Sequence, residues 1–166
     1  MTAIHQSHPT RLAEVDRYLA LVSQPDEYLD GICVQAARAF DVPMATVSFV
    51  HDDEVIFVGR HGVDLPGASA APGLCASAIA DTKAYVVPDA PAHPIAAQHP
   101  LVSGSPGLCF YAAAPITTAA GYRIGTVSVM DLRPRHTVPD EIAVLRDLAV
   151  QVGRELDARL AAAARK

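Results

Sequence analysis

The 166-residue sequence has no tryptophan, no asparagine, only two lysines and a formal net charge of −5. A surface that binds a nucleic-acid duplex normally gathers lysine and arginine side chains that neutralise phosphates. Here the one local group of arginines is small, formed by Arg123, Arg133 and Arg135. We therefore expect no nucleic-acid partner.

The sequence also lacks an export or membrane-spanning segment. Its start has neither the basic residues nor the apolar stretch of a secretory signal, and nowhere do about 18 apolar residues run together. Three widely spaced cysteines, Cys33, Cys75 and Cys109, form no CxxC pair and no zinc-type cluster with histidine. These features predict a cytoplasmic protein with free thiols, no membrane partner and no metal site.

What the sequence does contain is typical of one globular domain. Hydrophobic residues make up 51% and charged residues 19%, and the length suffices to bury a core. Aromatic residues are only 5%, so alanine and valine must fill much of the interior. We expect a flexible leader over residues 1–9 and a single domain over residues 10–164.

Two helices are expected near the N-terminus. The first begins at Thr10 and carries an apolar stripe with spacings of three, four and three residues, made of Leu12, Val15, Leu19 and Val22. The second follows a break at residues 23–26, where Ser23 can cap the new helix and Asp26 lies near its positive end.

The longest expected helix lies at the C-terminus. It starts at the Thr137–Asp140 signal and continues to about Ala164, which gives a length of roughly 38 Å. Its heptad seam consists of Ile142, Leu145, Ala149, Val152 and Leu156. A typical strand of about 17–20 Å covers only half of such a helix. We therefore expect a homodimer in which the apolar stripes of the first and last helices form a two-fold helical bundle.

Short apolar runs between these helices predict an antiparallel sheet. The expected strands are residues 44–50, 55–58, 85–87, 109–116 and 124–131. Two pairs of them form hairpins, which implies antiparallel neighbours. A loop over residues 60–72 precedes a short helix over residues 73–80, and residues 88–106 form an irregular, proline-rich connection of the kind that is usually functional. The fold class is α+β, with helices on one face of the sheet and irregular structure on the other.

This layout resembles the GAF domains of bacterial signalling proteins. The similar segments, in order, are residues 36–50, 60–63, 74–79, 87–90 with 99–102, 110–116 and 123–131. The resemblance implies a GAF-like (profilin-like) sheet of five or six antiparallel strands, terminal helices on one face, and a pocket beneath the short helix and the long loop on the other. It also implies a sensory, non-enzymatic role with a small-molecule ligand or a signalling-protein partner. The sequence names neither the ligand nor any cofactor.

The pocket implied by this resemblance would be mostly apolar, with a few polar groups to orient a ligand. We expect it to be bounded by Phe57, Leu74, Cys75, Ala78, Asp89, His93, Phe110, Ala112, Ser128 and Met130. No catalytic set of nucleophile, base and orienting group is visible.

Cys75 admits two interpretations. Near the start of a short helix, backbone N–H groups would lower the pKa of its thiol and favour a redox or attachment site. Alternatively, Cys75 packs the helix onto the sheet as a small hydrophobic residue, as we expect for Cys33 and Cys109. His93 and His99 lie in the long loop, where they reach the pocket or have no role in the site. His51 belongs to a solvated turn rather than a metal site.

Two other functions remain open. Residues 73–78 are similar to a segment of the free methionine-(R)-sulfoxide reductases, although Cys109 departs from that family's pattern and its tryptophan is missing. The other is a dimerisation or interaction module with a collapsed pocket. Neither Cys75 nor Cys109 is followed by the histidine of bilin-binding members, and the Asn-Lys-Phe-Asp-type motif of cyclic-nucleotide binders is absent.

Overall fold

A computed structural model describes residues 8–23 and 25–165. The helices are α2 (Pro9–Leu19), α3 (Glu27–Phe40), α4 (Leu74–Ala78), α5 (Pro100–Ser103) and α6 (Pro139–Ala164), with 3-10 turns η1 (Ala90–Ala92) and η2 (Ala96–Gln98). The strands are β1 (Met44–His51), β2 (Glu54–His61), β3 (Gly67–Ser69), β4 (Tyr85–Val87), β5 (Phe110–Thr117) and β6 (Arg123–Asp131).

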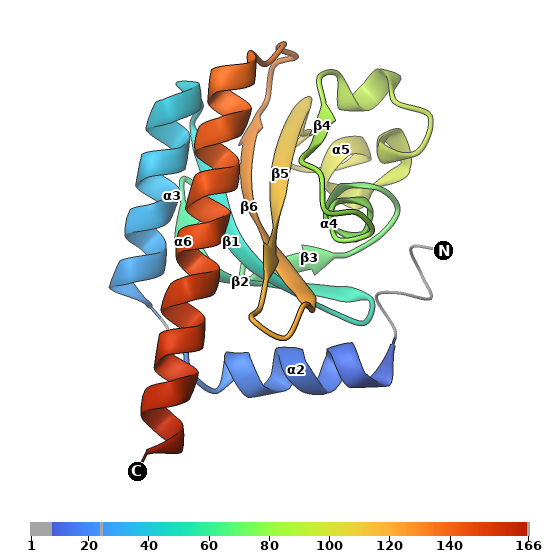
Figure 1. The fold of residues 1–166 in the computed structure, drawn as a ribbon. Coiled ribbons are helices and arrows are strands. Elements are labelled where there is room, and N and C mark those ends of the chain that lie inside the picture. Colours follow the sequence, from blue (N-terminus) through green and yellow to red (C-terminus); the bar gives the residue numbers. More distant parts are fainter. Residues whose placement is uncertain (1–7, 24, 166) are drawn as a thin grey trace.

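The strands form one antiparallel sheet in the order β3-β2-β1-β6-β5-β4, which confirms the predicted α+β architecture. Figure 1 shows α3 and α6 side by side along one face, with α2 lying across one end of the sheet. On the other face lie α4 and the segment 90–103 with its short helices, which together we call the roof.

Both edges of the sheet consist of three-residue strands. β3 lies within the segment predicted as a loop, because three residues are too few to show a strand's alternation. β4 pairs only with Tyr111–Ala113, so the following residues of β5 have no neighbour on that side within the described sheet.

The helix starts differ from the predicted caps. Asp26, not Ser23, caps α3, since its carboxylate accepts hydrogen bonds from the N–H groups of Leu29 (3.3 Å) and Ser23 (3.1 Å). The cap position of α6 is Val138, whose N–H donates to the Glu141 carboxylate at 3.0 Å. α2 begins at Pro9, inside the predicted leader, and residues 1–7 lie outside the described part of the chain.

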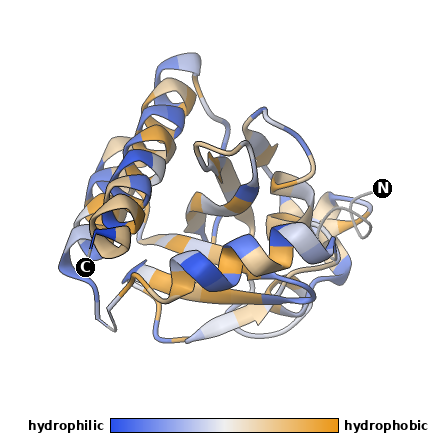
Figure 2. Ribbon diagram, turned by 60° about the horizontal axis from the view of Figure 1, so that its bottom comes forward, coloured by the Kyte–Doolittle hydropathy of each residue, from blue (hydrophilic) through white to orange (hydrophobic). Residues whose placement is uncertain are grey.

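Successive residues of a strand point to opposite faces, so the sheet buries two separate cores. Figure 2 shows hydrophobic colour concentrated along the strands and alternating with hydrophilic colour along the helices. The helix-side core includes the predicted α6 stripe, made of Leu145, Ala149, Val152 and Leu156, each no more than 2% exposed, together with Val15 of α2. Leu19, Val22 and Ile142 are half-buried against the same core, and Leu12 is also half-buried.

The buried part of these stripes is therefore covered within one chain and cannot form the predicted seam between two copies. For the half-buried Leu12, Leu19, Val22 and Ile142 the contact with a second copy stays a prediction. The expectation underestimated the length of the sheet and left out the contact of α6 with α3. β6 has nine residues and is about 30 Å long at the usual rise of a strand, and α3 lies beside α6. Sheet and α3 together cover nearly the whole apolar face of α6.

A hydrogen bond and an ion pair connect α6 to the N-terminal helices. The Tyr18 hydroxyl donates to Asp157 at 2.6 Å, and the Arg159 guanidinium binds both carboxylate oxygens of Asp26 at 2.7 and 3.2 Å. Burial alone would raise the pKa of Asp26, but hydrogen bonds from Arg159 and from the Ser23 and Leu29 N–H groups lower it below its ordinary value.

We predict opposite effects for two glycine substitutions. A Cβ at Gly59 would lie 2.8 Å from backbone atoms of Leu29, so Gly59→Ala pushes α3 off β2 and lowers the unfolding free energy by about 1–3 kcal/mol. Gly31 lies inside α3, where an added Cβ would meet nothing within 4 Å. Gly31→Ala therefore raises the unfolding free energy by about 0.5–1 kcal/mol. Denaturant unfolding measures both, and equal effects would contradict the close packing at Gly59.

We predict that Asp26→Asn lowers the unfolding free energy by about 2 kcal/mol at neutral pH, because Arg159 loses the more buried of its two carboxylate partners. The lowered pKa of Asp26 means that the ionised pair stabilises the native state above the unfolded-state pKa, and that this stability is lost as pH falls through the folded-state pKa. The difference between wild type and variant should therefore shrink in acid. A difference that stays constant from pH 7 to acid would contradict the assignment.

Candidate functional site

Five polar side chains meet on the roof side of the sheet, surrounded by an apolar core. We call this group the hydroxyl–thiol cluster, and its members are Ser48, Cys75, Tyr111, Thr126 and Ser128. All five are buried, with exposed fractions of 0–7%. Strand alternation places them together, since Thr126 and Ser128 are two residues apart on β6 and Ser48 of β1 is the register partner of Thr126.

The polar groups of the cluster are hydrogen-bond partners of one another. The Thr126 hydroxyl lies 2.8 Å from the hydroxyls of both Ser48 and Ser128, and the Tyr111 hydroxyl lies 3.1 Å from that of Ser128. The Cys75 sulfur completes the group at 3.1 Å from the Tyr111 hydroxyl and 3.9 Å from Ser48 and Thr126. Buried polar groups without such partners would destabilise the fold.

The cluster carries no charge at neutral pH. Burial raises the pKa of Cys75, and hydrogen bonds from Tyr111, Thr126 and Ser48 oppose this only in part. Burial also raises the pKa of Tyr111 well above its ordinary value. The predicted lowering of the Cys75 pKa by the helix start is therefore wrong, because α4 has only five residues and desolvation of the thiolate outweighs its effect.

The two parts of the roof, α4 and the segment 90–103, pack directly on each other. A Cβ at Gly73 would lie 3.1 Å from the Cα of Ala96, so the start of α4 and the segment 90–103 are in contact, as predicted for the two parts of the roof. The Ala76 N–H donates to the Ala70 carbonyl at 2.9 Å. Gly73 and Leu74 both have positive φ, 72° and 49°, and the latter is unfavourable for a residue with a side chain.

Both loop histidines support the roof. His99 is 1% exposed; its Nδ1 accepts from the Leu101 N–H at 3.1 Å, so Nε2 carries the hydrogen that it donates to the Ser69 carbonyl at 2.8 Å. Burial lowers the pKa of His99 and favours this neutral form. The Nδ1 of His93 accepts from the N–H groups of Ile95 and Ala96 at 3.2 and 3.0 Å.

The predicted pocket residues fall into three groups. Those in the roof-side core or the cluster are Phe57, Leu74, Cys75, Ala78, Met130 and Ser128. Phe110 and Ala112 lie in the helix-side core, so their assignment to the pocket is wrong by one residue of strand register. Their neighbours Tyr111 and Ala113 face the roof instead. Asp89 is exposed and lines a small hollow with Arg135 and His136. His93 hydrogen-bonds within its own loop, as described above.

Ser48, Tyr111 and Thr126 were missed by the sequence interpretation. Ser48 and Thr126 interrupt otherwise apolar strands at positions that face the same side as Ser128, and that alternation was the available signal. Tyr111 could have been found only with the correct register of β5.

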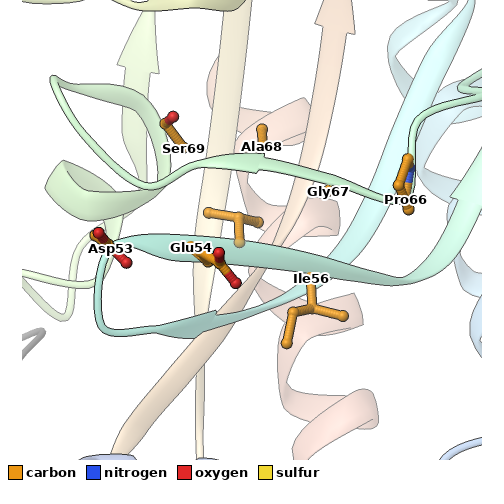
Figure 3. Close-up of a pocket in the computed structure, with 8 residues that line it drawn as sticks. Asp53, Glu54, Ile56, Pro66, Gly67, Ala68 and Ser69 are labelled. Carbon is orange, nitrogen blue, oxygen red and sulfur yellow. The ribbon is translucent and has the colours of Figure 1, made fainter.

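Several hollows on the described part of the chain lie away from the cluster. One of about 570 Å³ is an open groove along the paired strands β2 and β3, shown in Figure 3 and lined by Asp53, Glu54, Val55, Ile56, Pro66, Gly67, Ala68 and Ser69. Phe57 lines another with Asp30 and Arg60. The space between α4 and the sheet is filled by the cluster and its apolar surroundings. Among residues 8–23 and 25–165, no helix is long and apolar enough to cross a membrane, and no group of three metal-ligating side chains gathers.

An antiparallel sheet with long helices on one face and a small roof over buried polar groups defines a class of α+β domain. The chain belongs to the GAF domain family, whose model matches residues 24–156. This confirms the resemblance expected from the sequence.

The chain is also similar to individual known proteins, and these similarities agree with the family assignment. The chain is 31% identical over 141 residues to a cyclic di-GMP phosphodiesterase of Pseudomonas aeruginosa, an alignment that covers 84% of this chain and spans only 24% of that relative. The GAF domain of a phosphoenolpyruvate-protein phosphotransferase from Coxiella burnetii matches with a TM-score of 0.69 at 17% identity, covering 99% of each chain. A free methionine-R-sulfoxide reductase from Neisseria meningitidis matches with a TM-score of 0.62 at 21% identity, covering 82% and 78%. At these identities the two structures show a shared fold alone.

We predict that Cys75 resists alkylation in the native protein, because its thiol is buried and its pKa is raised. The partly exposed Cys109 should react faster. Single-cysteine variants treated with a maleimide would measure both rates, and denatured samples, in which the two thiols should react alike, provide the control. Faster reaction at Cys75 would contradict the closed site.

Proposed function

We propose that this chain is a sensory, non-catalytic GAF domain that binds a small ligand beneath α4, against the hydroxyl–thiol cluster, and signals through its terminal helices. The observation that carries the proposal is the cluster itself. It gathers five neutral hydrogen-bonding groups at one place in an apolar layer.

Ligand sites in proteins combine a mostly apolar lining with a few convergent polar groups. Valine or alanine at the positions of Ser48, Thr126 and Ser128 would fill such a core without any need for hydrogen-bond partners. The polar residues there are therefore better explained by recognition than by stability. None of the five is ionised, so a charged ligand group would be buried there without an ion partner, which is costly. We therefore expect the ligand atoms that meet them to be uncharged, such as hydroxyl, carbonyl or ring nitrogen atoms.

Binding requires α4 to move, since the space beneath it is filled. This helix is a single turn, and the positive φ of Leu74 strains its start. Such a segment opens at a lower free-energy cost than the strands and long helices do.

A continuous set of contacts leads from the cluster to α6. On β5, Tyr111 is preceded by Phe110, which faces the helices and whose ring centroid lies 6.4 Å from that of Phe40 in α3. The Arg135 guanidinium lies 5.3 Å from the Phe110 ring centroid and binds Glu141 in the first turn of α6 at 3.0 Å. A shift of β5 caused by the ligand would thus change the packing of both α3 and α6.

The reductase alternative has less support. Its chemistry requires a thiolate that attacks sulfoxide sulfur, whereas the Cys75 thiol is buried and its pKa is raised. The similarity to the Neisseria enzyme concerns the fold alone. The match to part of a phosphodiesterase supports a role in signalling, while the hydrolytic activity in that name is a property of that protein.

A closed interaction module is the second candidate, and the filled space beneath α4 favours it. The two candidates differ in one measurable property, which is the binding of a small molecule at the cluster.

We predict that native mass spectrometry or thermal-shift screening with uncharged metabolites finds a compound that raises the melting temperature of the wild-type chain. Tyr111→Phe removes one hydroxyl of the cluster and should weaken binding about tenfold, which corresponds to one lost hydrogen bond. The control, Tyr122→Phe, changes a half-buried tyrosine at the β5–β6 turn and should leave affinity unchanged. Equal effects of the two variants, or no stabilising compound, would favour the closed interaction module instead.

A further inference from the structure

The two ends of the short helix α4 are held in different ways. At its start, Gly73 packs closely against Ala96 of the roof. Just after its end, the backbone carbonyl groups of Ile79 and Ala80 accept hydrogen bonds from one arginine side chain of the sheet. The start of α4 is therefore held by the roof, and its end is held by a charged side chain of the sheet.

That side chain belongs to Arg123, the first residue of β6. Its Nε donates to the Ile79 carbonyl at 2.6 Å, and its Nη2 donates to the Ala80 carbonyl at 3.5 Å. Ile79 is fully buried and Arg123 is half-buried, so water has little access to the shorter bond. A hydrogen bond with a charged donor is stronger than one between neutral groups.

The contact lies one helical turn from the hydroxyl–thiol cluster. The Ile79 N–H donates to the Cys75 carbonyl at 3.1 Å, so both residues belong to the same turn of chain. A movement that lifts this turn from the sheet must expose the Cys75 sulfur and must also break the bond between Ile79 and Arg123. The strength of that bond therefore affects how often the cluster opens.

Arg11 of α2 contacts Arg123 from the end of the sheet that α2 crosses (Figure 1). Arg11 is 1% exposed, and its Nη1 donates to the Arg123 carbonyl at 3.3 Å. Burial lowers the pKa of Arg11 to about 10, the charge of Asp52 opposes this, and the nearby charge of Arg123 lowers the pKa further. Arg11 is thus still protonated at neutral pH, and its repulsion directs the Arg123 guanidinium away from α2 and toward α4.

From these contacts we propose that Arg123 is the positioning residue that keeps α4 closed over the hydroxyl–thiol cluster, and that Arg11 links this closure to the docking of α2. The inference deepens the proposed function, on which its role in signalling rests. The closure itself is a property of the chain without a ligand. A chain that binds no ligand can still show it, and a chain that lacks it can still bind one.

Thiol labelling measures the opening of α4. Maleimide treatment of the native protein, followed by peptide mass spectrometry, gives separate rates for Cys75 and Cys33. Cys33 is fully buried in the helix-side core, so its rate reports unfolding of the whole domain. Arg123→Gln should raise the rate at Cys75 about tenfold, the effect of one lost charge-assisted hydrogen bond, and should change the rate at Cys33 less than about twofold.

Arg60→Gln is the matched control. The Arg60 guanidinium also donates to a backbone carbonyl, that of Leu65 at 3.0 Å, but it does so in the loop after β2. This variant should leave the Cys75 rate unchanged, while Arg123→Lys, which keeps a charged donor, should give a rate between those of wild type and Arg123→Gln. An unchanged Cys75 rate in Arg123→Gln, an equal rise at Cys33, or an equal rise in Arg60→Gln would overturn the inference.

A double variant tests the link to α2. Arg11→Met keeps an apolar stem but removes the donor and the charge. It should raise the Cys75 rate by itself and add little in the Arg123→Gln background, because both changes act on the same contact. No effect of Arg11→Met, or additive effects, would overturn the link. If Arg11→Met also speeds labelling of Cys33, Arg11→Lys replaces it, with the same non-additivity expected.

Discussion

The central constraint of this structure is that the sheet separates two cores, so that each buried strand residue belongs to one or the other. Helices α3 and α6 cover one face and the roof covers the other, so each face of the sheet carries a buried core. Adjacent residues such as Phe110 and Tyr111 therefore have different roles, one packing under the helices and the other beneath α4. The same alternation links the two layers, since a movement of β5 displaces both side chains together.

This constraint also explains how much the sequence could predict. The strands around Ser48 and Thr126 and the helix that ends at Phe40 have clear apolar periodicity, and their positions agree with the structure. The face of β5 could not be assigned, because Phe110, Tyr111 and the alanines that follow are all compatible with burial on either side. A run without a polar residue contains no signal for its register.

The missed features have related causes. The sequence indicated that α6 has an apolar stripe, but whether Leu145 and Val152 contact their own sheet or a second chain depends on the length of the sheet and the position of α3. The environment of Cys75 likewise depends on residues 36 and 51 positions away, Tyr111 and Thr126, which surround its sulfur. Local reasoning about a helix start cannot include such long-range burial, and here burial determines the protonation state of the thiol.

The short edge strands have a consequence for solubility of the assembled sheet. An uncovered strand edge offers N–H and C=O groups to any other strand, which is the route to sheet-to-sheet aggregation. On one side β3 offers only three residues. On the other, pairing with β4 stops at Ala113 of β5, and the unpaired stretch that follows contains Pro115, which has no N–H to donate. Proline at this edge blocks the addition of a foreign strand, so copies of the sheet cannot extend one another into fibres there.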